Sequence, residues 1–219
     1  VLSRGVDTAL FNPARRSAAL RARWEARPDD LVCLVVGRLA PEKNLALAFA
    51  AFAAIRAERP HARMVCVGDG PSAAALARNH PAVHFSGMRR GEDLAAHYAS
   101  ADLFLFPSLT ETFGNVVSEA LASGLPVVAY DHAAAGDLVV NDRNGWLVPP
   151  GDAAAFIDAS RKMARQVAGQ SVPRQACVDS VRHLNWEHIH DGYAAMLEDV
   201  VKHHAAALPA LPAIHLAPD

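Results

Sequence analysis

Short apolar runs alternate along the chain with longer stretches whose apolar residues recur at helical spacing. Six of the runs are rich in valine, leucine and phenylalanine and show little polar alternation, which is typical of strands covered on both faces. These six predicted strands are residues 31–37, 63–68, 83–87, 103–107, 126–131 and 145–148.

The segments between the predicted strands are long enough for helices. Residues 44–59 place apolar side chains on one helical face and are followed by Pro60, and residues 115–123 predict a shorter helix that ends before Gly124. Alternating strands and helices predict an α/β fold, a Rossmann-like doubly wound parallel sheet of about six strands.

The pattern changes after Gly151. Asp152 is a suitable N-cap, and three helices are expected at residues 152–168, 173–183 and 186–203. We therefore expect a leading interdomain segment (1–13), one domain with extra C-terminal helices (14–204) and an Ala/Pro-rich tail (205–219). Because the chain opens at Val1, we expect it to be a fragment of a longer protein.

Composition excludes several classes of protein. The chain has 219 residues, of which 52% are hydrophobic and 20% charged, and its net charge of -2 gives no basic field for nucleic acid. No apolar run reaches the ~20 residues that a membrane-spanning helix needs. Cys33, Cys66 and Cys177 are expected to be free thiols, since three cysteines form no disulfide framework. The histidines are dispersed, so no metal site is expected.

Ligands of doubly wound sheets bind at the carboxyl ends of the strands, so the loops there are the candidate site. After the first strand, Gly37 permits close backbone approach, and Arg38 and Lys43 suit the oxygens of a diphosphate. The structural alternative pairs Lys43 with Glu42 and leaves Arg38 in solvent.

The loop after the second strand matches the loose dinucleotide pattern G-x-G-x-x-A through Gly68, Gly70 and Ala73. Asp69 would direct a carboxylate towards a pyrophosphate there, and Pro71 fits the first position of a helix. We therefore interpret this loop as a structural turn, and not as a nicotinamide site.

Two carboxylates follow the fourth strand. Glu111 lies in the loop and Glu119 on the helix after it, and both can face one crevice, where paired carboxylates suit the vicinal hydroxyls of a sugar or ribose. Gly114 and Asn115 present N–H groups at the helix start, which favours phosphate. In the structural alternative Glu111 caps the helix and Glu119 is exposed, although a buried acid among the apolar neighbours of Glu119 would need a partner.

The sequence has no D-x-D motif for a metal-held diphosphate. The charge of a departing diphosphate is therefore expected to be neutralised by Arg38, Lys43 and the helix dipole, without a metal.

With these motifs the chain resembles the C-terminal, donor-binding half of retaining glycosyltransferases of the GT-B fold, family 4. The resemblance extends from Arg4 to about Val201. It rests on motifs in family order, namely residues 36–39 (VGRL), 42–44 (EKN), 67–71 (VGDGP), 101–108 (ADLFLFPS), the E-x7-E pair Glu111 and Glu119, 124–128 (GLPVV) and 145–152. The sequence of residues 110–116 looks most like the corresponding segment of bacterial GDP-mannose-dependent α-mannosyltransferases.

The resemblance implies a role for each matching residue. Arg38 and Lys43 bind the diphosphate as it departs, Glu111 contacts the transferred sugar, and Glu119 contacts the ribose. The loop with Met88 and Arg89 lies near the base. The full expected donor site is Gly37, Arg38, Lys43, Met88, Arg89, Glu111, Phe113, Gly114, Asn115, Val116 and Glu119, with Arg38, Lys43 and Glu111 catalytic.

The implied function is metal-independent transfer of mannose from GDP-mannose to a glycan or glycolipid, with no cofactor, in the cytoplasm or at the cytoplasmic membrane. The acceptor site belongs to an N-terminal domain outside this chain, so we expect the chain alone to be inactive. Asp137 replaces a longer glutamate of many members, which puts contacts of residues 133–137 in doubt. The alternatives are a nucleotide-sugar epimerase of the same fold and a non-catalytic nucleotide-binding module. The sequence gives no signal for oligomeric state.

Overall fold

A six-stranded, fully parallel sheet forms the centre of the computed structural model, which describes residues 5–111 and 114–205. The strand order is β3-β2-β1-β4-β5-β6. The strands are β1 (Val32–Val36), β2 (Arg63–Val67), β3 (Val83–Gly87), β4 (Leu103–Phe106), β5 (Val127–Tyr130) and β6 (Gly145–Val148). All six predicted strands are confirmed, with ends that agree within one residue.

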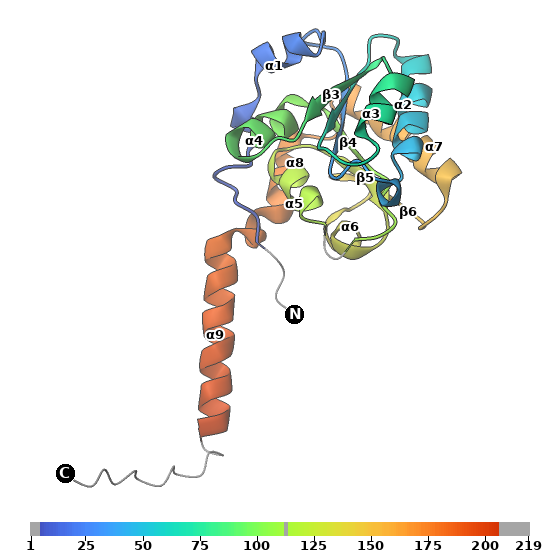
Figure 1. The fold of residues 1–219 in the computed structure, drawn as a ribbon. Helices are drawn as coiled ribbons and strands as arrows, with labels where there is room; N and C mark the ends of the chain where they lie inside the picture. Colours follow the sequence, from blue (N-terminus) through green and yellow to red (C-terminus); the bar gives the residue numbers. More distant parts are fainter. Residues whose placement is uncertain (1–4, 112–113, 206–219) are drawn as a thin grey trace, which may run out of the picture.

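Helices cover both faces of this sheet (Figure 1). Helices α2 and α7 pack together on one face, and α4, α5 and α8 lie on the other. The helices are α1 (Ala18–Arg23), α2 (Leu45–Glu58), α3 (Ala73–Asn79), α4 (Gly91–Ser100), α5 (Asn115–Ala122), α6 (Ala133–Leu138), α7 (Ala153–Ala168), α8 (Arg174–Val181) and α9 (Trp186–Ala205), with 3-10 turns η1 (Pro13–Arg15), η2 (Pro41–Lys43) and η3 (Arg182–Leu184). The doubly wound fold predicted from the sequence is thus confirmed.

Strand order reverses between β1 and β4. The chain moves outward from β1 through β2 to β3, then returns to the other side of β1, where Cys33 pairs with Leu103, and continues outward to β6. The loops after β1 and β4 therefore leave the sheet in opposite directions, and a crevice opens between them at the carboxyl edge.

The glycines after β2 allow this loop to support the loop after β1. A Cβ atom on Gly68 would lie 1.8 Å from the carbonyl oxygen of Gly37, and one on Gly70 would lie 2.5 Å from that of Leu39. The predicted structural turn is confirmed in this form. The position predicted for Pro71 is wrong, because Pro71 lies two residues before α3 in a preceding turn.

The cysteines are buried thiols, as predicted. Burial raises the pKa of Cys66 and of Cys177 to about 12, and that of Cys33 even further. All three thiols are therefore protonated and unreactive at neutral pH.

The C-terminal helices differ in how they meet the domain. Asp152 caps α7 as predicted, accepting a hydrogen bond from the N–H of Ala155 at 2.9 Å, and α8 packs against α5. Helix α9 instead projects away from the sheet (Figure 1). The N–H of Val6 donates to the carbonyl of Leu184 at 2.8 Å, so the two ends of the domain lie side by side. Among the described helices, none has the length and apolar character to cross a bilayer.

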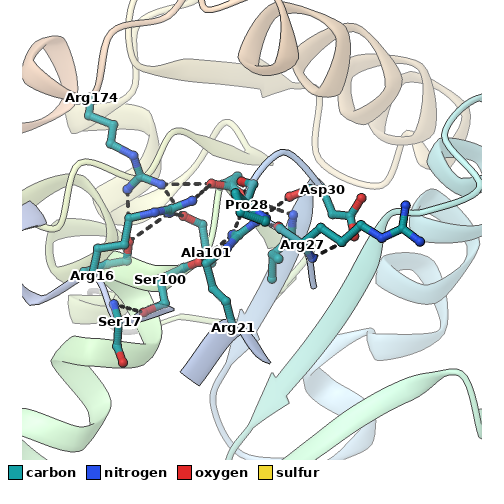
Figure 2. Close-up of polar contacts among 12 residues, drawn as sticks. Arg16, Ser17, Arg21, Arg27, Pro28, Asp30, Ser100, Ala101 and Arg174 are labelled. Atoms are coloured by element: carbon teal, nitrogen blue, oxygen red, sulfur yellow. Dashed lines mark hydrogen bonds and ion pairs between the residues drawn. The ribbon is translucent and has the colours of Figure 1, made fainter. Parts of the chain in front are cut away.

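Arginines from distant segments of the chain form a cluster of hydrogen bonds and ion pairs at the amino end of the sheet (Figure 2). Asp102, just before β4, accepts hydrogen bonds from Arg16 at 3.0 Å, from Arg21 at 2.9 Å and from Arg174 at 3.0 Å. It also accepts the N–H of Val32 at 2.9 Å. The arginines donate as well to backbone carbonyls at the end of α4. Four segments of the chain are joined here through one carboxylate.

We expect Asp102→Ala to lower the free energy of unfolding by about 3–5 kcal/mol, because it leaves the buried guanidinium of Arg21 without a counterion. Urea unfolding monitored by circular dichroism measures this loss. The matched control is Asp179→Ala, which removes an exposed ion pair with Arg182 and is expected to cost less than about 1 kcal/mol. Equal losses in the two variants would contradict a structural role for the cluster.

Candidate functional site

The loops after β1 and β4 meet at the reversal of strand order. Lys43 from the first loop forms an ion pair with Glu111 from the second, and their side chains are only 23% and 11% exposed. A small hollow lies beside the pair, between Gly37 and Arg38 on one side and residues 106–108 on the other. The structure thus brings together two of the three residues predicted to be catalytic.

The local backbone explains how the first loop reaches the crevice. Gly37 has a φ of +152°, and a Cβ atom placed there would meet nothing within 4 Å, so its backbone borders open space. The chain then makes the turn η2, which ends at Lys43, and Asn44 with a φ of +50° redirects it into α2. Lys43 is therefore held at the start of α2, pointing across to Glu111.

Arg38 is placed differently from Lys43. Its side chain is 67% exposed, and its guanidinium lies 3.6 Å from the carboxylate of Glu42. The structural alternative that paired Lys43 with Glu42 is therefore wrong, because the partner of Lys43 is Glu111. The exposed contact with Glu42 holds Arg38 only weakly, so its guanidinium can turn towards the crevice.

The start of α5 forms the other wall of the crevice. Gly114 has a φ of +91° just before the helix, and a Cβ atom there would lie 3.9 Å from the Cγ atom of Glu111. Asn115 is exposed and Val116 half-buried. Among the described residues, no hydrogen bond joins Glu111 to the N–H groups of α5, so the capping alternative is wrong. Phe113, also predicted for the site, lies outside the described residues.

Glu119 is half-buried and has the partner that an acid among apolar neighbours needs. The hydroxyl of Tyr98, a fully buried residue of α4, donates to its Oε2 atom at 3.0 Å. Burial raises the pKa of Glu119, and the hydrogen bond from Tyr98 opposes that rise. The alternative of an exposed Glu119 is therefore wrong. Within the described part of the chain the two carboxylates have different partners, Lys43 for Glu111 and Tyr98 for Glu119.

Sequence reasoning missed Tyr98. It lies 21 residues before Glu119, in a segment between two predicted strands for which no specific helix was predicted. A pairing of α4 with α5 can be inferred only once both helices are known to lie on the same face of the sheet.

The loop after β3 carries the two residues predicted to lie near a nucleobase. Met88 is 56% exposed. Arg89 donates to the carbonyl of Ser86 at 2.8 Å and to the carboxylate of Asp93 at 3.1 Å. These contacts fix Arg89 at the same edge of the sheet as the crevice, and its contact with a base stays a prediction.

The loop after β5 contributes α6 to this edge. Ala134 lies 3.8 Å from the position that a Cβ atom on Gly114 would take. Asp137, on the same helix, is exposed. Across the described ranges, no three His, Cys, Asp or Glu side chains gather in a way that could hold a metal ion.

The raised pKa of Glu119 predicts a dependence of stability on pH. As pH rises past the ordinary glutamate value, the unfolded chain releases this proton before the folded chain does, so the free energy of unfolding falls until the folded carboxyl also ionises. Glu119→Gln keeps an acceptor for Tyr98 and removes this slope.

Denaturant unfolding at pH 4 and pH 8 tests this expectation. Relative to the wild type, Glu119→Gln should be more stable at pH 8 by a margin that shrinks at pH 4. The control Glu198→Gln, at an exposed position of α9, should follow the wild type. A Glu119→Gln difference that is the same at both pH values would contradict the assignment.

Comparisons with known proteins show the family of this chain. Residues 30–166 match the family described as "Glycosyl transferases group 1". The GDP-mannose-dependent alpha-mannosyltransferase of Mycobacterium tuberculosis is 41% identical over 78% of this chain and 45% of its own length. A protein of the same name from Corynebacterium glutamicum is 33% identical over 93% of this chain and 46% of its own.

A solved structure gives the same result for the fold. Sucrose-phosphate synthase from Thermosynechococcus elongatus superposes with a TM-score of 0.74 and 28% identity, over 94% of this chain and 52% of that protein. The chain spans less than half the length of the two mannosyltransferases. The chain belongs to the group 1 glycosyl transferases, and its six-stranded sheet has the fold of one domain of a GT-B enzyme.

Proposed function

We propose that this chain is the donor-binding domain of a retaining glycosyltransferase that transfers mannose from GDP-mannose to a glycan or glycolipid. The observation that carries the proposal is the ion pair between Lys43 and Glu111 across the crevice where strand order reverses. The identity with two GDP-mannose-dependent mannosyltransferases supports the choice of base and sugar.

Lys43 and Arg38 are proposed to neutralise the diphosphate. Negative charge accumulates on the diphosphate as its bond to the sugar breaks, and cations placed in advance stabilise that charge. Glu111 holds the ammonium of Lys43 in position before the donor binds. The exposed guanidinium of Arg38 can then supply a planar pair of donors to the phosphate oxygens.

The carboxylates are proposed to bind hydroxyl groups. One oxygen of Glu111 is engaged by Lys43, which leaves the other to accept a hydrogen bond from the transferred sugar. One oxygen of Glu119 is engaged by Tyr98, which leaves the other for the ribose. The N–H groups at the start of α5, from Gly114 to Val116, are proposed to bind a phosphate of the donor, since no side chain caps this helix start.

Retention of configuration requires attack on the face that the diphosphate leaves. In the proposed reaction the bond from the sugar C1 atom to the diphosphate breaks, the bond from C1 to the acceptor oxygen forms, and the diphosphate takes the acceptor's proton. This chain supplies charge and orientation to the donor, without a metal. The acceptor is proposed to come from a further domain, so we expect no turnover by this chain alone.

Replacing the two cations tests the proposed site. In the full-length protein, Arg38→Ala and Lys43→Ala should each lower kcat for transfer from GDP-mannose in EDTA by about 10²–10³-fold, since each removes a charge that stabilises the leaving group. Lys162→Ala, which removes a cation paired with Asp142 on the far side of the domain, is the matched control and should retain activity.

Three outcomes would count against the proposal. Full activity in Lys43→Ala would mean that the crevice is not the site of chemistry. Nucleotide binding without transfer in the wild-type full-length protein would favour the non-catalytic module, and interconversion of sugar epimers would favour the epimerase.

A further inference from the structure

Two adjoining hollows lie at the opposite edge of the sheet from the donor crevice. One, of about 470 Å³, is lined by apolar side chains that include Phe49, Phe52 and Pro81. The other, of about 340 Å³, is lined mainly by polar groups. Both share Arg56 and residues 81–83 as lining, so together they form one groove with an apolar half and a polar half.

The polar half carries an excess of positive charge. Arg23 at the end of α1, Arg56 on α2 and Arg63 at the start of β2 all line it. The only carboxylate among the residues that line the polar half is that of Glu25, which lies 3.9 Å from the guanidinium of Arg63. Within the described ranges, neither the guanidinium of Arg23 nor that of Arg56 has a hydrogen bond or ion pair. Two guanidinium groups from separate elements are thus available to one anion.

Trp24 adds an independent observation at the same place. Trp24 is among the residues that line the polar half and is only 3% exposed, and its buried indole N–H has no acceptor among the residues that the structure describes. Buried donors are nearly always paired in folded proteins. The unpaired indole N–H therefore lies in the wall beneath the two arginines.

The location separates this groove from the donor site. Arg63 and Val83 are the first residues of β2 and β3, and Arg23 and Arg56 stand near the C-terminal ends of α1 and α2. The donor crevice opens at the last residues of the strands. The groove therefore has no part in the function proposed above, and its test is independent of that function.

We propose that this groove binds an amphiphile with a phosphate head and a hydrocarbon chain, that is, an anionic phospholipid. Guanidinium groups bind phosphate oxygens well. The apolar half next to them can bury a hydrocarbon chain, whose removal from water is favourable. Charge complementarity selects an anionic head, and the continuity of the two halves selects an amphiphile over a soluble anion.

Flotation of the full-length protein with lipid vesicles tests this proposal. The wild type should float with vesicles of phosphatidylcholine containing phosphatidic acid, and not with phosphatidylcholine alone. The double variant Arg23→Gln/Arg56→Gln should lose about tenfold or more in partition, since each cation near an anionic surface contributes a substantial share of binding. Arg143→Gln/Arg182→Gln removes the same charge from exposed positions elsewhere and should bind as the wild type does.

The apolar half has its own variant. Ala53→Asp places a carboxylate on the exposed side of α2 within the groove and should also weaken flotation, whereas Ala154→Asp at an exposed position of α7 should not. Thermal unfolding of each variant checks that the fold is retained.

Three results would overturn the proposal. Equal flotation of the Arg23/Arg56 variant and the wild type would exclude the groove as the lipid site. Binding of glycerol phosphate without binding of vesicles would identify a soluble phosphate as the ligand. Binding of polyglutamate without binding of vesicles would identify an acidic protein segment.

Discussion

The reversal of strand order between β1 and β4 is the constraint on which the candidate site depends. Two loops that start from neighbouring strands diverge there, and the ion pair of Lys43 and Glu111 spans the gap between them. Each group gives the other a counterion at a place where both are largely buried. The charges of Lys43 and Glu111, which would be costly to bury alone, are thus kept in position for a ligand that has both charged groups and hydroxyls.

The two edges of the sheet differ in how firmly their charged residues are held. At the amino edge, Asp102 gathers arginines from the N-terminal segment and from α8, and fixes them to the end of α4 (Figure 2). At the carboxyl edge the residues are held less tightly, with Arg38 exposed and Gly37 bordering open space. The tightly paired charges lie around Asp102, and adaptable groups lie where the donor is proposed to bind.

Much of this arrangement could be predicted from the sequence, because its signals are local. Strands buried on both faces produce apolar runs that locate them to within a residue, and the capping of α7 by Asp152 depends on three residues of chain. Lys43 and Glu111 were predicted individually from the loops that carry them.

The contacts between those groups could not be predicted in the same way. The pairing of Lys43 with Glu111 depends on which strands are neighbours, and that of Tyr98 with Glu119 on which helices share a face. The Asp102 cluster joins arginines more than 150 residues apart, namely Arg16 and Arg174, and no spacing in the sequence connects them.

Thermal unfolding in EDTA with and without GDP tests the central claim most directly, in the wild type and in Lys43→Ala. A ligand at about 100 times its Kd adds about 2.7 kcal/mol, which for a domain of this size raises Tm by about 5–10 °C. We predict this shift for the wild type with GDP, a smaller one with UDP or ADP, and the loss of most of it in Lys43→Ala. An equal shift in the wild type and in Lys43→Ala would contradict the assignment of the crevice as the donor site.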